Sequence, residues 1–294
     1  MCCGSDTAAP NVRISSVKPA IRLLAVDIDG TLLDPQFQVS AANLAALRRA
    51  HAAGIEIVLG TGRRHAFAMP IAEALGFDVW LISSNGAVTK SSRGETFHQD
   101  LLPAAVARRL LQHMAQFRRN TVLTFDREGR GALVVENAEE LNGSITRWME
   151  KNRDFIDFVV PLENALMADP IQAMFCGAIA PMKIAEQHLA AGGFAGEITV
   201  LKTQYEARDL CIIDVLNREC SKGHALRRWA QHRGFSRNQV MAIGDNYNDV
   251  EMLAFAGFPV IMGNAAEDLK QNGWQVTLSN DQSGVAAALE AAGI

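Results

Sequence analysis

Residues 21–31 read IRLLAVDIDGT, and this stretch decides the fold. Ile21 to Ile28 form an apolar run rich in branched side chains, which predicts a fully buried parallel strand. Asp27 and Asp29 stand two residues apart, so they share one face of that strand. We expect both carboxylates at the carboxyl end of the strand, where open α/β sheets bind ligands. Gly30 permits a sharp exit, although Asp-Gly is also an ordinary turn signal.

Helices and strands alternate on both sides of a long central segment. After the first strand, the pattern predicts a helix over 41–53, a strand over 55–59, a helix over about 64–75 and a strand over 79–83. The same alternation resumes at Lys222 and continues to a terminal helix over 284–292. This rhythm predicts a doubly wound parallel sheet, an α/β fold of the Rossmann-like kind.

The central segment, 88–215, has a different pattern. Short predicted strands over 88–90 and 95–98 suggest a hairpin, and further helices and strands follow without the parallel alternation. We expect an inserted α+β domain over 88–215, because roughly 120 residues can hold a core of their own. The α/β domain would then comprise 19–87 and 216–294, and the polar segment 1–18 would be a disordered tail.

Two more groups of polar residues follow predicted strands. GDNYND, residues 244–249, comes directly after the apolar run 240–243 and opens a helix. Helix capping is an equal alternative for Asp249 alone, but it does not account for Asp245 behind a strand and a glycine. Gly60-Thr61-Gly62 follows the strand over 55–59, and its N–H groups with the Thr61 hydroxyl can form an anion site.

The carboxylates of Asp27, Asp29, Asp245 and Asp249 would repel one another strongly at adjacent strand ends. A cation must compensate, and Mg²⁺ is suited because it takes hard oxygen ligands and often binds through few carboxylates plus a substrate phosphate. Lys222 supplies a further positive charge, although alone it would be an ordinary surface lysine. The sequence therefore predicts a magnesium site beside an anion site.

These motifs occur in one order, each at a strand end, and together they resemble the haloacid dehalogenase superfamily. Residues 27–31 are similar to its first motif, Thr61 to the second, Lys222 to the third, and 244–245 with 248–249 to the fourth. The insert lies between the second and third motifs, where the Cof-like branch carries a type IIB cap domain. Ser84-Asn85-Gly86-Ala87 also resembles that branch. The resemblance covers the chain from about Ile21 to its end.

The resemblance implies a magnesium-dependent phosphatase that forms an aspartyl-phosphate. Asp27 would be the nucleophile and a metal ligand, and Asp29 the general acid and base that binds the metal through its backbone carbonyl. Asp245 would be another ligand, and Asp249 would support the metal shell or orient Lys222. The phosphate would be held by Thr61, Gly62, Lys222, Asn248 and the backbone of Ile28.

The implied substrate is a small phosphorylated metabolite, and many members of the branch act on sugar phosphates. Specificity is expected in the cap, whose cleft-facing side chains the pattern does not identify. Asn85 is a candidate to face the cleft, whereas Arg63, Arg64 and His65 are expected to form a solvated helical turn. A phosphomutase of the same fold and a non-catalytic metal-binding regulatory module stay open as alternatives.

The composition narrows the possible partners and the compartment. A net charge of −4 over 294 residues, with scattered Lys and Arg, gives no reason to expect nucleic acid. No apolar run reaches the roughly 18 residues of a membrane helix, so no membrane partner is expected. Cys176, Cys211 and Cys220 form no CxxC pair, which favours reduced thiols and the cytoplasm. The oligomeric state is left open.

Overall fold

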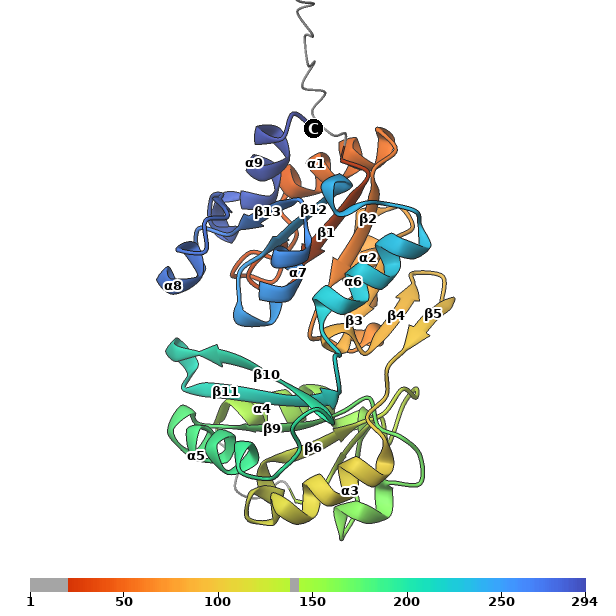
Figure 1. Ribbon diagram of the computed structural model, residues 1–294, viewed down its shortest axis with the longest axis vertical. Coiled ribbons are helices and arrows are strands. Elements are labelled where there is room, and N and C mark those ends of the chain that lie inside the picture. Colours follow the sequence, from red (N-terminus) through yellow and green to blue (C-terminus); the bar gives the residue numbers. More distant parts are fainter. Residues whose placement is uncertain (1–20, 138–142) are drawn as a thin grey trace, which may run out of the picture.

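Residues 21–137 and 143–294 are described by the computed structural model, and the predicted tail over 1–18 lies outside the described residues. Two sheets with their own helices lie one above the other in Figure 1. The upper sheet has eight strands and the lower sheet has six. None of the helices in these ranges combines the length and apolar character needed to cross a membrane.

The eight-stranded sheet has the order β14-β13-β12-β1-β2-β3-β4-β5, and it is parallel from β14 to β3. Its parallel strands are β1 (Leu23–Asp27), β2 (Glu56–Gly60), β3 (Trp80–Ser83), β12 (Val240–Gly244), β13 (Phe258–Ile261) and β14 (Gln275–Val276). The helices around them are α1 (Ala41–Ala52), α2 (His65–Leu75), α6 (Lys222–His232), α7 (Val250–Phe255), α8 (Glu267–Lys270) and α9 (Gly284–Ala291). The predicted doubly wound α/β fold is confirmed.

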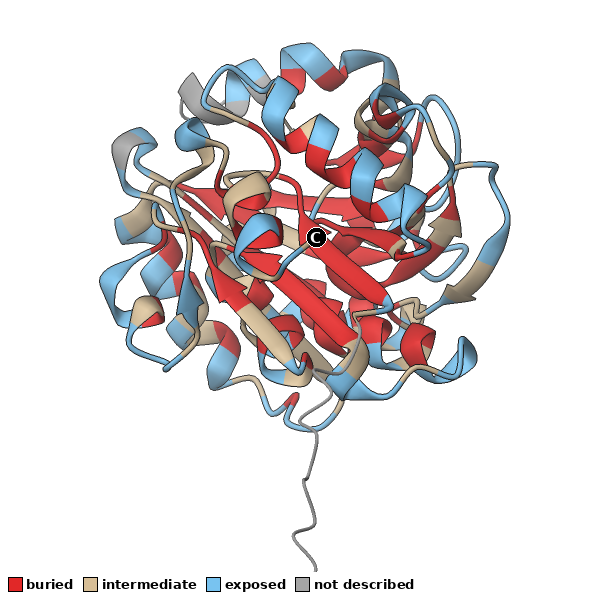
Figure 2. Ribbon diagram, turned by 90° about the horizontal axis from the view of Figure 1, so that it is seen from above, coloured by how far each residue is buried: buried red, intermediate tan, exposed pale blue. Residues whose placement is uncertain are grey.

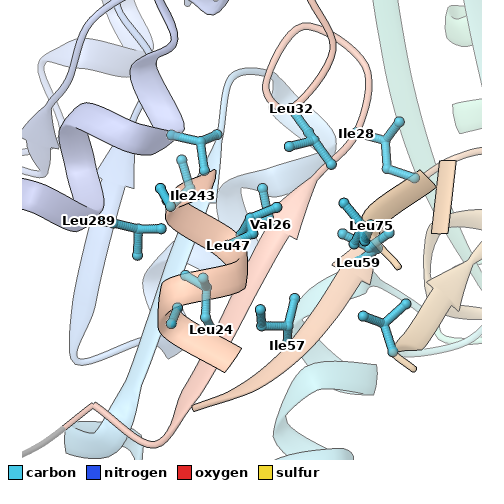
Figure 3. Packing of buried hydrophobic residues seen from close by; sticks show 14 of the residues in the cluster. Leu24, Val26, Ile28, Leu32, Leu47, Ile57, Leu59, Leu75, Ile243 and Leu289 are labelled. Carbon is cyan, nitrogen blue, oxygen red and sulfur yellow. The ribbon is translucent and has the colours of Figure 1, made fainter. Parts of the chain in front are cut away.

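Strand β1 is buried on both faces, as its continuous apolar sequence predicts. Leu24 and Val26 belong to the cluster that packs under α1, α2 and α9, where Figure 3 shows them beside Leu47 and Leu289. Leu23 and Ala25 face the opposite cluster, beneath α6 and α7. Figure 2 shows the result, with buried strands between helices whose outer faces are exposed. This two-sided packing fixes the end of β1, and therefore Asp27, at the middle of the sheet.

The predicted start of the insert at residue 88 is wrong. β4 (Val88–Ser91) pairs antiparallel with β3, and β5 (Thr96–Gln99) pairs with β4, so this hairpin extends the eight-stranded sheet. At the other end, β11 (Leu210–Asn217) stays in the six-stranded sheet up to Asn217. A hairpin satisfies its backbone equally well on either sheet, so its local pattern does not say which sheet it joins. We call 100–217 the cap and the rest of the described chain the core domain.

The cap sheet has the order β10-β11-β9-β6-β7-β8. Its strands are β6 (Thr121–Thr124), β7 (Leu133–Val135), β8 (Ile156–Phe158), β9 (Gln172–Gly177), β10 (Ile198–Tyr205) and β11. Helices α3 (Ala104–His113) and α5 (Ile179–Ala190) cover one face through the larger cap cluster, whereas α4 (Gly143–Asn152) packs on the other face through Met149. Figure 1 shows β10 and β11 on the side of the cap nearest to the core domain.

The turn between β3 and β4 packs tightly against the start of α6. Gly86 has φ +107°, and a Cβ atom at this position would lie 2.2 Å from the carbonyl oxygen of Ser221. Ser221 caps α6, since its Oγ accepts from the N–H of His224 at 3.2 Å. The turn therefore helps to position Lys222, the first residue of α6.

Gly86→Ala should lower the free energy of unfolding more than Gly234→Ala does. Gly234 also has positive φ, +70°, but no atom lies within 4 Å of its would-be Cβ. Its substitution should cost only the strain of left-handed backbone, about 1–2 kcal/mol, whereas Gly86→Ala adds a backbone clash. Urea unfolding of both variants measures the difference, and equal losses would contradict the close packing.

Candidate active site

A buried cluster of charges lies at the ends of β1 and β12. Lys222 Nζ donates to Asp27 Oδ1 at 2.6 Å and to Asp249 Oδ1 at 2.7 Å. All three side chains are buried. The sequence reaches this arrangement through three separate elements, the end of β1, the start of α6 and the loop after β12. The structure thus brings together predicted residues that lie up to 222 positions apart in the chain.

The third carboxylate of the cluster is held by the loop after β1. Thr31 Oγ1 donates to Asp245 Oδ1 at 3.0 Å. Gly30 has φ +84°, and a Cβ atom there would lie 2.3 Å from Asp245 Oδ2, so any side chain would displace this carboxylate. Asp249 Oδ2 accepts from the N–H groups of Asp245 and Asn246, at 3.0 and 3.1 Å. Asp249 therefore supports both Lys222 and the loop that carries Asp245.

The cluster has three carboxyl groups, those of Asp27, Asp245 and Asp249, and one ammonium group, that of Lys222. Burial, followed by the charge of Asp249, raises the pKa of Asp27 to about 7 even with Lys222 beside it. Burial and Asp27 raise the pKa of Asp245 well above its ordinary value. Burial acts to lower the pKa of Lys222, but Asp249 and Asp27 more than offset it, so this pKa is raised.

Asp27, Asp245 and Asp249 offer carboxylate oxygens that lie within 4.8 Å of one another. Three converging hard donors with too little positive charge fit a divalent cation such as Mg²⁺. The acidic triad is therefore a candidate metal site.

Asp29 does not join this triad with its side chain. Its carboxylate accepts from Arg63, whose Nε lies 2.7 Å from Asp29 Oδ2 and whose Nη2 bonds the other oxygen. The expectation that Arg63 and Arg64 form a solvated helical turn is wrong, because Arg63 pairs with Asp29 and Arg64 is buried. His65 is half-buried, and its Nε2 lies 3.1 Å from the carbonyl oxygen of Ser91. The sequence held a signal for this ion pair. Asp29 was predicted at the end of one strand, and Arg63 follows the end of the neighbouring strand.

The Thr61 loop presents fewer free donors than its sequence suggests. The N–H of Thr61 donates to the carbonyl of Ile82 at 2.8 Å, within the sheet. The N–H of Arg63 donates to Thr61 Oγ1 at 3.0 Å. Gly62 lines the cavity between the two domains, whereas Thr61 is buried beside it. Ile28, on the facing loop, packs its side chain into the core while its carbonyl accepts from Leu32 and Leu33.

A chain of side-chain hydrogen bonds connects the core domain to the cap. Asn248 Nδ2 donates to Asn85 Oδ1 at 2.9 Å, and Asn85 Nδ2 donates to Asp214 Oδ2 at 2.8 Å. Gln172 Nε2 donates to the other oxygen of Asp214, also at 2.8 Å. Burial raises the pKa of Asp214 to about 7, although both amides favour its ionised form. The candidates Asn85 and Asn248 therefore contact each other, and the sequence reading missed Asp214 and Gln172.

A cavity of about 590 Å³ lies between the core domain and the cap and reaches Asp27 and Asp29. Its cap side is formed by alternate residues of two strands, Gln172 and Met174 on β9 and Leu210, Ile212 and Asp214 on β11. Tyr205, at the end of β10, also lines it. Burial, and then the charges of Asp29 and Asp27, raise the pKa of Tyr205 to about 12, so its hydroxyl stays neutral above the acids.

The cap is docked on the core domain around this cavity. Arg64 Nη2 donates to the carbonyl of Arg127 at 2.8 Å, and the rings of Phe67 and Phe155 meet edge to face at 5.1 Å. Lys90 of β4 forms an ion pair with Asp126 of the cap at 2.6 Å. With the Asn85–Asp214 bond, these contacts join the cap to the core domain at several points around the cavity.

The chain is similar to known hydrolases over most of its length. Residues 24–289 match the family of haloacid dehalogenase-like hydrolases. The chain is 34% identical over 284 residues to the phosphatase YwpJ of Bacillus subtilis, covering 90% of this chain and 98% of that protein. It is 28% identical to the pyridoxal phosphate phosphatase YbhA of Escherichia coli, covering 85% and 90% of the two chains.

A solved haloacid dehalogenase-like hydrolase from B. subtilis superposes on this structure with a TM-score of 0.77 and 28% identity. The alignment covers 92% of this chain and 99% of that one. The predicted resemblance is therefore confirmed at the level of sequence and of fold.

Asp214→Asn should make the free energy of unfolding depend less on pH between about pH 4 and pH 7. The pKa of Asp214 is about 7 in the folded protein and 3.8 ordinarily, so the folded state holds a proton that the unfolded state loses between these values. The stability contribution of Asp214 is then full below about pH 4 and falls as the pH rises towards 7. The wild type should lose up to about 1.4 kcal/mol per pH unit relative to the variant in that window.

Urea unfolding of both proteins at pH 5, 6, 7 and 8 measures this difference. Asp154→Asn is the control, because Asp154 is an exposed residue of the same domain. A constant difference between wild type and Asp214→Asn across the series would show that Asp214 does not titrate in this window.

Proposed function

The chain belongs to the haloacid dehalogenase-like hydrolase family and is a phosphatase, and on this basis we propose that it hydrolyses small phosphorylated metabolites with Mg²⁺ through an aspartyl-phosphate on Asp27. The observation that carries the proposal is the buried triad of Asp27, Asp245 and Asp249 with Lys222 between two of its members. Such a cluster is costly to bury without function. It also assembles, at one point, a carboxylate nucleophile, a cation site and a fixed ammonium.

The residues of the chain divide the work of the reaction. An oxygen of Asp27 attacks the phosphorus while the bond to the leaving oxygen breaks, and protonated Asp29 donates its proton to that oxygen. Asp29 then removes a proton from water, whose oxygen attacks the phosphorus and releases Asp27 and inorganic phosphate. Lys222 stabilises negative charge on the transferring group. Mg²⁺, held by Asp27, Asp245 and the backbone carbonyl of Asp29 and supported by Asp249, would supply further charge neutralisation.

The remaining site residues position these groups. Arg63 holds the carboxylate of Asp29 through two hydrogen bonds in this structure, and Asp29 must leave this pairing to take up and donate a proton. The Thr61 hydroxyl, the Gly62 N–H, the Ile28 backbone and Asn248 are proposed to hold the phosphate oxygens. Asn85 holds Asn248 in place and connects it to the cap.

The proposed substrate is a small phosphorylated metabolite, with sugar phosphates as the leading class. The cavity of about 590 Å³ has the size of a small-molecule site. The relative named as a pyridoxal phosphate phosphatase, like the one named simply as a phosphatase, favours hydrolysis over the phosphomutase alternative. A complete set of acids with Lys222 disfavours a non-catalytic module. We place the activity in the cytoplasm, in keeping with the buried, unpaired thiols of Cys176, Cys211 and Cys220.

Asp27→Asn should remove phosphatase activity without unfolding the protein. The substituted amide oxygen can still accept from Lys222, and one of several crowded negative charges is lost, so the melting temperature without metal should be equal or higher. Hydrolysis of p-nitrophenyl phosphate with Mg²⁺, next to a thermal melt, tests both halves. Asp154→Asn is the surface control. Retention of more than a few per cent of activity would rule out Asp27 as the nucleophile.

Magnesium should stabilise the fold as well as support activity. A ligand that binds only the folded state adds about 2.7 kcal/mol at a hundredfold excess over its dissociation constant. Thermal melts in EDTA and then in Mg²⁺ should therefore show a rise in melting temperature for the wild type. The rise should be lost in Asp245→Asn, since Asp245 belongs to the triad but does not contact Lys222. Full activity in EDTA would contradict the metal dependence.

A further inference from the structure

Two buried side-chain polar atoms lack a hydrogen-bond partner within the part of the chain that the structure describes. They are Oε1 of Gln172, on β9 of the cap, and Nη1 of Arg64, at the start of α2 in the core domain. The two residues are 5% and 9% exposed, and both line the cavity above Asp27 and Asp29. Burying an unpaired polar atom is costly, and here both instances occur in the walls of one cavity.

The orientation of Gln172 follows from Asp214. The amide nitrogen of Gln172 donates to Asp214, which is the arrangement that the ionised carboxylate requires, and the amide oxygen is turned away from it. Asn85 is oriented by the other oxygen of Asp214 in the same way. Gln172 is therefore fixed as an acceptor, and its complement is a hydroxyl or amino group.

The orientation of Arg64 is fixed as well. One of its terminal nitrogens, Nη2, donates to the carbonyl of Arg127 at 2.8 Å. Its guanidinium carbon lies 5.0 Å from the ring centre of Phe67 and 5.8 Å from that of Phe155. The other terminal nitrogen, Nη1, is left as a donor. Burial disfavours the positive charge of this side chain and therefore lowers the pKa of Arg64. Its complement is an anionic group.

The charges around the cavity point the same way. Close to the reaction centre, Arg63 is paired with Asp29. Away from it, the lining carries the cations Arg64 and Lys151 against the carboxylate of Asp214. This part of the wall thus has an excess of positive charge that the phosphate under attack, held at Asp27 and Lys222, does not use.

We propose that Gln172 and Arg64 form a subsite for the leaving group, and that the substrate is a hydroxylated phosphate ester with a second anionic group. A phosphorylated sugar acid or a sugar bisphosphate has this chemistry. Gln172 accepts from a hydroxyl, and Arg64 binds the second anion. Both residues lie where the cap meets the core domain. This inference rests on the proposed phosphatase function and narrows its substrate class.

Four six-carbon phosphate esters separate the two contacts. n-Hexyl phosphate has neither group, sorbitol 6-phosphate has hydroxyls, 6-phosphonooxyhexanoate has a carboxylate, and 6-phosphogluconate has both. We expect the wild type to show the highest kcat/KM with 6-phosphogluconate, with each group adding about 10- to 100-fold, the usual range for a hydrogen bond to a charged partner or a buried polar one. Sorbitol 1,6-bisphosphate then tells whether the second anion is a carboxylate or a phosphate.

Two variants assign the gains to residues. Arg64→Met should lower kcat/KM for the two carboxylate esters about 10- to 100-fold more than for n-hexyl phosphate. Gln172→Leu should lower it more for the two hydroxylated esters than for the other two. Arg49→Met and Gln187→Leu, exposed positions away from the cavity, are the matched controls. Arg64→Lys keeps the charge and should retain part of the carboxylate preference, which covers the case that Arg64→Met folds poorly.

The outcomes separate this inference from the function on which it rests. If the wild type does not cleave p-nitrophenyl phosphate in Mg²⁺, the proposed function itself fails. If it does cleave that ester but treats the four six-carbon esters alike, the subsite is overturned and the function stands. The subsite is also overturned if Arg64→Met or Gln172→Leu lowers all four esters by one factor, since the residue would then only hold the cap.

Discussion

The hydrogen bonds from Lys222 to Asp27 and Asp249 are the interaction on which the rest of this structure depends. A fully buried ammonium is stable only with anionic partners, and two buried carboxylates this close are tolerated only with a cation between them. Each partner therefore requires the others. Because the three residues come from β1, the start of α6 and the loop after β12, the cluster also fixes how these elements meet.

This requirement explains why glycines surround the centre. The carboxylate of Asp245 approaches the backbone of Gly30 more closely than any Cβ would allow, and the turn at Gly86 touches the residue just before Lys222. These close approaches make the loops part of the charge cluster instead of flexible connections. Substrate specificity is therefore expected from the cap side of the cavity, because the tightly packed residues around Lys222 cannot adjust to different substrates.

The sequence predicted the core domain well and the cap only in outline. Buried parallel strands, and the acids at their ends, follow from local pattern, so Asp27, Asp245 and Asp249 were found. The hairpin over 88–99 was assigned to the wrong sheet, because strand pattern does not reveal the partner strand. Asp214 was missed for a related reason. β11 is apolar on both faces, LCIIDVL, so alternation could not show which side faces the cleft.

The core domain and the cap are connected by a chain of hydrogen bonds between amide side chains and one carboxylate. The cluster around Lys222, in contrast, consists of ion pairs. Asn248 is linked through Asn85 to Asp214, and from there to Gln172 on the cap. While Asp214 is ionised it can only accept, and each amide along this chain then has one favoured orientation. A docked cap and a correctly oriented Asn248 are therefore parts of the same hydrogen-bond pattern. Separating the cap would break the Asn85–Asp214 bond and remove one constraint on Asn85, and with it one constraint on Asn248 at the proposed phosphate site.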